Sequence, residues 1–262
     1  MKKSLRAAIA AALILPALAM AQSAFNGTWK VDLSKVQEPR KPAVITLEHG
    51  VYHCTSCFLP SFTIKADGED HPITGHPGFD AVAVKVVNDH TVRLTSKKNG
   101  KIADEQTMTV APDGETATMD IANFSGSSPV TAKVTLMRIG EGKRGENAVA
   151  GSWRTAKLND FSANGLIVTY KVEGDNISMS TPTGMSYTAK LDGPAAPIHG
   201  QPGNPTVTVR KLGSRSLRET FERDGKVLAV DTLSVAANGK TMMETGHDVQ
   251  RGTTTKQVAE KQ

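Results

Sequence analysis

The chain has 262 residues, of which 22% are charged, with a formal net charge of +5 and two cysteines. This length allows one or two domains. Part of the positive charge lies at the N-terminus, in Lys2, Lys3 and Arg6, and subtracting these three charges from +5 leaves about +2 for the remainder. The other basic residues are interspersed with acidic ones and form no stripe with aromatic residues, so we expect no nucleic-acid partner.

The first 21 residues have the pattern of a secretory signal peptide. A basic start is followed by the apolar run Ala7–Met20, and Ala19 and Ala21 provide the small residues of a cleavage site before Gln22. The apolar run is short for a membrane span and no second one follows, so we expect no membrane-spanning segment. These features predict a bacterial protein that is periplasmic or secreted.

After the leader, the sequence is rich in Thr, Val, Gly, Ser and Ala, and turn residues recur about every ten positions. This pattern favours antiparallel all-β structure, and we find no convincing amphipathic helix. In the first half the expected strands are, in chain order, Gly27–Leu33, Ala43–Glu48, Val51–Thr55, Ser61–Ala66, Ala81–Val87, Thr91–Lys97, Ile102–Val110, Thr116–Ala122 and Thr131–Ile139.

The second half of the chain repeats the first. "FNGTWKVD" at 25–32 returns as "VAGSWRTA" at 149–156, and "PITGHPGFDAVAV" at 72–84 returns as "PIHGQPGNPTVTV" at 197–209. From Asp67 to Met119 the two copies align without a gap at an offset of 125 residues. The repeat predicts a first domain at 22–139, a polar, glycine-rich linker at 140–150 and a second domain at 151–262.

Each copy would form eight or nine strands joined by tight turns, and closing such a meander into a barrel removes its exposed edges. "NGTWKVD" and "AGSWRTA" resemble the G-x-W opening of the lipocalin-like barrels. The arrangement also resembles a group of uncharacterised exported bacterial proteins with tandem lipocalin-like repeats. The resemblance implies two tandem up-and-down barrels, with Trp29 and Trp153 closing a barrel end and an interior that holds a small ligand.

The two cysteines, Cys54 and Cys57, occur in a C-x-x-C spacing in the first copy only. In a redox-active C-x-x-C pair, a helix N-terminus usually lowers the pKa of a thiol. Here we expect strands on both sides of the motif and no helix, which disfavours a redox role. Export favours a local disulfide, and this is the interpretation we prefer. The alternative is a metal or thiol-redox site at one rim of the first barrel, with the ligand set His53, Cys54, Cys57, His71 and His76.

The sequence contains no motif for catalysis. It has neither a G-x-S-x-G nor an H-E-x-x-H pattern, and its acidic residues lie mostly in turns or alternate with basic ones. We therefore expect a non-enzymatic protein without a cofactor. The leading hypothesis is a binding or structural protein of the cell envelope whose partner is a small apolar or amphipathic ligand.

Overall fold

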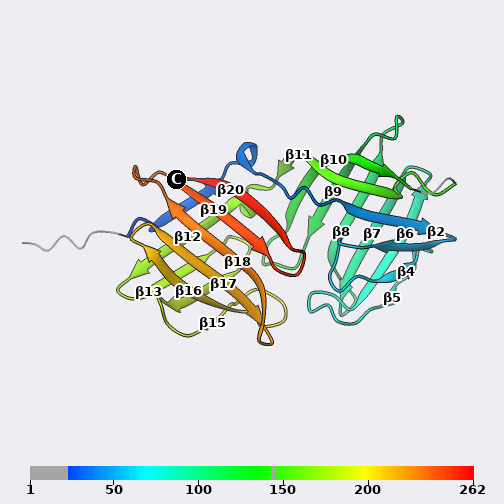
Figure 1. The fold of residues 1–262 in the computed structure, drawn as a ribbon. Coiled ribbons are helices and arrows are strands. Elements are labelled where there is room, and N and C mark those ends of the chain that lie inside the picture. The colour runs from blue at the N-terminus through cyan, green and yellow to red at the C-terminus, as the bar shows by residue number, and fades with distance from the viewer. Residues whose placement is uncertain (1–22, 143–144) are drawn as a thin grey trace, which may run out of the picture.

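The computed structural model describes residues 23–142 and 145–262, so the expected signal peptide, residues 1–21, lies outside the described residues. The expectation of an all-β fold with two antiparallel barrels is confirmed: two ten-stranded sheets each curl into a nearly closed barrel, and the barrels lie side by side (Figure 1). The two short 3-10 helices are η1 (Leu33–Lys35) and η2 (Ala163–Leu166).

Barrel one is a continuous piece of the chain, from residue 43 to residue 161. Its strands, in the order in which they pair, are β4 (Thr63–Lys65), β3 (Val51–Cys54), β2 (Ala43–Glu48), β11 (Gly151–Phe161), β10 (Val130–Glu141), β9 (Thr116–Asn123), β8 (Lys101–Val110), β7 (Thr91–Lys98), β6 (Ala81–Asn88) and β5 (His71–Pro72).

Barrel two combines the first described strand of the chain with its last third. Its strands, in the order in which they pair, are β14 (Ser186–Lys190), β13 (Asn176–Ser180), β12 (Ile167–Glu173), β1 (Gly27–Val31), β20 (Thr253–Lys261), β19 (Thr241–Asp248), β18 (Lys226–Val235), β17 (Ser216–Arg223), β16 (Thr206–Gly213) and β15 (Ala196–Pro197).

The expected domain boundaries at 22–139 and 151–262 are therefore wrong, because each repeat places its first strand in the other barrel. β1 pairs with β12 and β20, whereas β11 pairs with β10 and β2. The segment 140–150 is not an interdomain linker, since it connects two paired strands of barrel one, and its residues 143–144 lie outside the described residues. The barrels are joined instead at 32–42 and 162–166.

Barrel one is thus inserted into a hairpin of barrel two. β1 and β12 pair antiparallel, with Lys30 opposite Ile167. Residues 32–166, which include all of barrel one, connect these two strands. The two ends of the insert also meet, because Ala43 lies opposite Trp153 on neighbouring strands β2 and β11. Both crossings are short, which fits an insertion at a hairpin tip.

The remaining edges of each sheet come together and close the barrel. In barrel two, Ser186 and His199 exchange two backbone hydrogen bonds of 3.1 and 2.8 Å. In barrel one, the Gly68 amide donates to the Val84 carbonyl at 2.9 Å. Closure of this kind leaves few unpaired strand edges that could template aggregation.

Local sequence explains both the strands and the turns. Val82 and Val84 in β6 are fully buried, as are their counterparts Val207 and Val209 in β16, because alternate residues of a strand face the same side. The turn Asn99–Gly100 has φ of 50° and 75°, which is the left-handed backbone of a type I′ hairpin. Each barrel has its own hydrophobic core.

Candidate functional site

A cavity of about 300 Å³ opens into barrel one. Its inner wall is formed by side chains of five neighbouring strands: Ile45, Gln106, Met119, Leu136 and Trp153. Four of these are apolar, and Ile45, Leu136 and Trp153 belong to the buried core. This size is at the lower end of the range for small-molecule sites, which are mostly apolar with a few polar groups.

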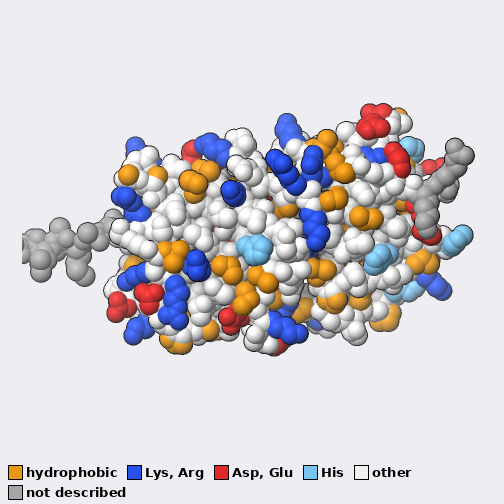
Figure 2. Space-filling model, in the orientation of Figure 1, with side chains coloured by type: hydrophobic (Ala, Val, Ile, Leu, Met, Phe, Trp, Pro, Cys, Tyr) orange, Lys and Arg blue, Asp and Glu red, His pale blue; other side chains and the backbone are white. Residues whose placement is uncertain are grey.

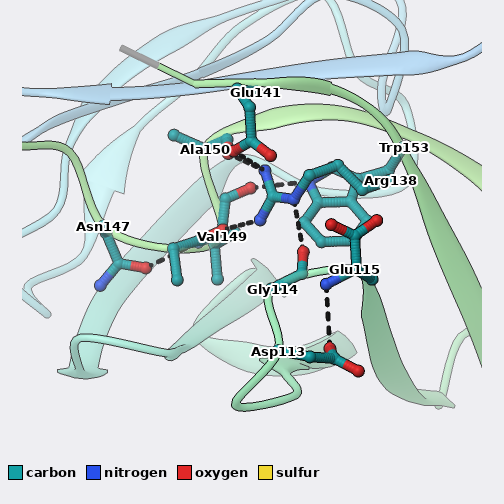
Figure 3. Close-up of polar contacts among 10 residues, drawn as sticks. Asp113, Gly114, Glu115, Arg138, Glu141, Asn147, Val149, Ala150 and Trp153 are labelled. Carbon is teal, nitrogen blue, oxygen red and sulfur yellow. Dashed lines mark hydrogen bonds and ion pairs between the residues drawn. The ribbon is translucent and has the colours of Figure 1, made fainter. Parts of the chain in front are cut away.

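Trp153 forms part of the cavity wall and is held from behind by Arg138 of β10 (Figure 3). The guanidinium carbon of Arg138 lies 4.1 Å from the centre of the indole ring. The same guanidinium donates to the carbonyls of Gly114, Ala150 and Ala148 at 2.5, 2.9 and 2.6 Å. The planar guanidinium donates to three carbonyls and at the same time stacks on the indole ring, so Arg138 fixes the position of Trp153.

The two tryptophans are equivalent in their local structure. The indole of Trp153 donates to the Val149 carbonyl at 2.8 Å, and that of Trp29 donates to the Phe25 carbonyl at 2.9 Å. Both rings are buried, each near the start of the first strand of its repeat, so each lies in the barrel formed mainly by the other repeat. In barrel two, Lys261 replaces the arginine, with Nζ 5.3 Å from the ring centre of Trp29.

Replacing Arg138 with methionine is expected to destabilise barrel one by about 2–4 kcal/mol, since it removes the cation–π contact and leaves buried carbonyls without a donor. The matched change in barrel two, Lys261→Met, should cost less than about 1 kcal/mol. Urea unfolding followed by tryptophan fluorescence in Trp29→Phe and Trp153→Phe backgrounds separates the two barrels. Equal losses in both would contradict the role given to Arg138.

The mouth of the cavity is built by both barrels. Arg251, in the turn between β19 and β20 of barrel two, donates from Nε to the Ser56 carbonyl and from Nη2 to the Cys57 carbonyl, both at 3.3 Å. Its Nη1 pairs with Asp248 at 2.7 Å. Lys41, from the segment that joins the barrels, donates to the Arg251 carbonyl at 3.0 Å. These contacts hold barrel two against the mouth.

The expected disulfide is confirmed: Cys54 and Cys57 are bonded, with their Cα atoms 5.6 Å apart. Cys54 ends β3 and belongs to the buried core, and Cys57 lines the cavity mouth. The bridge therefore fixes the 54–57 turn that Arg251 contacts. The role is local, since the loop that it closes is very short.

The alternative metal site does not assemble. His53 Nδ1 bonds to the Phe62 carbonyl at 2.9 Å, His71 pairs with Asp67 at 2.8 Å, and His76 stacks on Phe79 with ring centres 4.5 Å apart. Burial lowers the pKa of His76. Across residues 23–142 and 145–262, no group of three His, Cys, Asp or Glu residues is placed to hold a metal.

Barrel two contains a cluster of carboxyl groups that sequence reasoning missed. Glu219 of β17 lies directly opposite Asp231 of β18, and Glu244 of β19 lies opposite Gln257 of β20, whose amide donates to it at 2.9 Å. Across from Asp231 is Gly246, where a Cβ atom would come within 3.0 Å of the carboxylate oxygen. The absence of a side chain at Gly246 therefore leaves room for the Asp231 carboxylate.

Two tyrosines complete this carboxyl cluster. The Tyr187 hydroxyl of β14 donates to Glu219, and the buried Tyr170 of β12 lies close enough to the same carboxyl to affect its pKa. Burial raises the pKa of Glu219 to about 8 and that of Asp231 to about 7, and it also raises the pKa of Glu244. Charged forms are disfavoured away from water, so the cluster retains protons near neutral pH.

Comparison of the two copies would have revealed this cluster. At the offset of 125 residues, Leu94, Gln106 and Met119 of barrel one stand where barrel two has Glu219, Asp231 and Glu244. An acidic residue in place of a buried Leu or a half-buried Met is the signal, because alternate residues along these strands face the interior. The interiors of the two barrels therefore differ: barrel one contains an apolar cavity, and barrel two contains a cluster of protonated carboxyl groups.

In the part of the chain that the structure describes, no helix has the length and apolar character needed to cross a membrane. The sequence matches no protein-family model, and no curated protein or solved structure is significantly similar to the chain. Function must therefore be argued from the two barrels themselves.

Proposed function

We propose that this is an exported, lipocalin-like protein that binds a small, largely apolar molecule in barrel one and does not catalyse a reaction. The observation that carries the proposal is the cavity itself, which is walled by Ile45, Met119, Leu136 and Trp153 and opens at a polar mouth. Transfer of an apolar ligand from water into such a site is favourable in proportion to the area that it buries.

The carboxyl cluster of barrel two does not support a catalytic role. Groups with strongly shifted pKa values are common in active sites, but Glu219 is only 3% exposed and its carboxyl accepts a hydrogen bond from Tyr187. A substrate in solution would not reach this carboxyl without opening the barrel. The proposal therefore gives the two barrels different roles, with barrel one binding the ligand and barrel two holding part of its mouth.

The first test is binding of 1-octanol, a short neutral amphiphile, to a Trp29→Phe variant. Trp153 is then the only tryptophan, and it lines the cavity, so its emission reports occupancy. We expect saturable one-to-one binding with a Kd below about 1 mM, confirmed by calorimetry.

The cavity is tested by filling it. In Met119→Phe the larger ring should occupy the space and weaken octanol binding at least tenfold. The control is Met243→Phe, on the same type of strand in barrel two, because Met243 is 58% exposed. The thermal midpoint of each variant verifies that it folds. Absence of saturable binding in the wild type, or unchanged binding in Met119→Phe, would contradict the proposal.

A further inference from the structure

The cavity mouth carries more positive than negative side chains. Lys41, Arg154 and Arg251 line it together with one acidic residue, Glu38. Over the middle of the face shown in Figure 2, where the segment between β1 and β2 crosses, basic side chains gather rather than acidic ones. An apolar interior with a basic mouth is the arrangement that suits an amphiphile with a negative end.

The three basic residues are not equivalent. Arg251 is fully engaged, since its guanidinium bonds to Ser56, Cys57 and Asp248. Among the described residues, the only side-chain hydrogen bond of Arg154 is to the Met137 sulfur, at 3.2 Å, and that of Lys41 is to a backbone carbonyl. Within the described ranges, neither Arg154 nor Lys41 forms an ion pair. Their charges are therefore available to a ligand.

Glu38 does not neutralise them. Its carboxyl forms no ion pair with a described residue, and burial raises its pKa, so the protein disfavours its charged form. An arginine on a strand and a lysine on the adjoining segment present donors that match an anionic oxygen group, and arginine does so with a planar fork.

We propose that the barrel-one ligand carries an anionic head group, such as a carboxylate, bound at the mouth by Arg154 and Lys41 while its apolar part fills the cavity. This rests on the proposed function and narrows it to one ligand class. The head-group site also depends on barrel two, because the Arg251 carbonyl holds Lys41 and the Arg251 guanidinium holds the 54–57 turn.

The test compares octanoate with 1-octanol, which share an eight-carbon chain and differ in charge. Arg154→Gln should weaken octanoate binding at least about fivefold, as expected for a lost hydrogen bond to a charged group, and should change octanol binding less than twofold. Raising the salt concentration should weaken octanoate binding and leave octanol binding unchanged.

The matched control is Lys101→Gln, which removes a positive charge from an exposed residue of β8 in barrel one that does not line the cavity. It should leave both affinities within twofold. If octanol binds and Arg154→Gln changes the two affinities equally, the head-group proposal is wrong and the ligand-binding function stands. If neither compound binds, the proposed function itself fails, and the head-group site fails with it.

Discussion

A shortened chain, in which residues 32–166 are replaced by a short Asn-Gly turn, is expected to fold into barrel two alone. The deletion removes all of barrel one and joins Val31 to Ile167, next to the Lys30–Ile167 pair of the same hairpin. Short hairpin loops of this kind are compatible with antiparallel strands. Folding is measured by urea unfolding followed by the fluorescence of Trp29, the only tryptophan in the shortened chain. We expect one cooperative transition.

The complementary fragment, residues 43–161, is expected to fold into barrel one alone. Shortening it to 43–142, close to the boundary that the repeat suggests, should abolish folding because β11 and Trp153 are lost. Loss of a buried tryptophan side chain alone costs about 3–5 kcal/mol, a large part of the usual stability of a domain. If 43–142 folds as well as 43–161, the exchange of first strands is wrong.

The stability of barrel two is expected to fall as the pH rises from about 4.5 to 8. Glu219 has a pKa near 8 in the folded barrel and an ordinary value of 4.5, so between these values the folded state binds the proton and the unfolded state does not. The stabilisation is complete below pH 4.5 and is lost as the pH rises through 8. For Glu219 alone the loss is of the order of 5 kcal/mol.

This pH effect is measured by urea unfolding of a Trp153→Phe variant, in which Trp29 reports on barrel two, at pH 5 and pH 8.5. Glu219→Gln keeps an oxygen for the Tyr187 hydroxyl but cannot ionise, so it should be more stable than the parent at pH 8.5. Glu173→Gln, at an exposed surface ion pair with Lys171, is the control and should change little. A parent whose stability is the same at both pH values would refute the cluster's role.

The strands and their turns could be predicted from sequence because their causes are local. The expected run Ala43–Glu48 is β2 itself, and the Asn99–Gly100 turn lies where its residue types require it. The disulfide could also be predicted, since the expected export favours disulfides and the absence of any other thiol left one partner for each cysteine. Alternation, turn chemistry and covalent chemistry each act within a few residues.

The exchange of β1 and β11 could not be predicted in this way. The two strands share the pattern "NGTW" and "AGSW", so each has the residues to fit either barrel, and the choice depends on contacts made far away in the chain. Lys30 of β1, for example, pairs with Ile167 of β12 and Glu260 of β20. The carboxyl cluster was missed because its members, about 12 residues apart, converge only when the strands pair.

The insertion of one barrel into the other also sets an order of events during synthesis. Thr28 of β1 meets Thr169 of β12, which is 141 residues further along the chain. At about 5–20 residues per second, roughly 7–28 s pass between the synthesis of Thr28 and that of its partner. After β10 has been made and before β11 emerges, the position of β11 next to β10 is still empty. β1, which carries the same tryptophan motif as β11, is already present at that time. β1, the first strand of the described residues, is therefore made long before either of its partners, whereas β11 meets β10 as soon as it emerges.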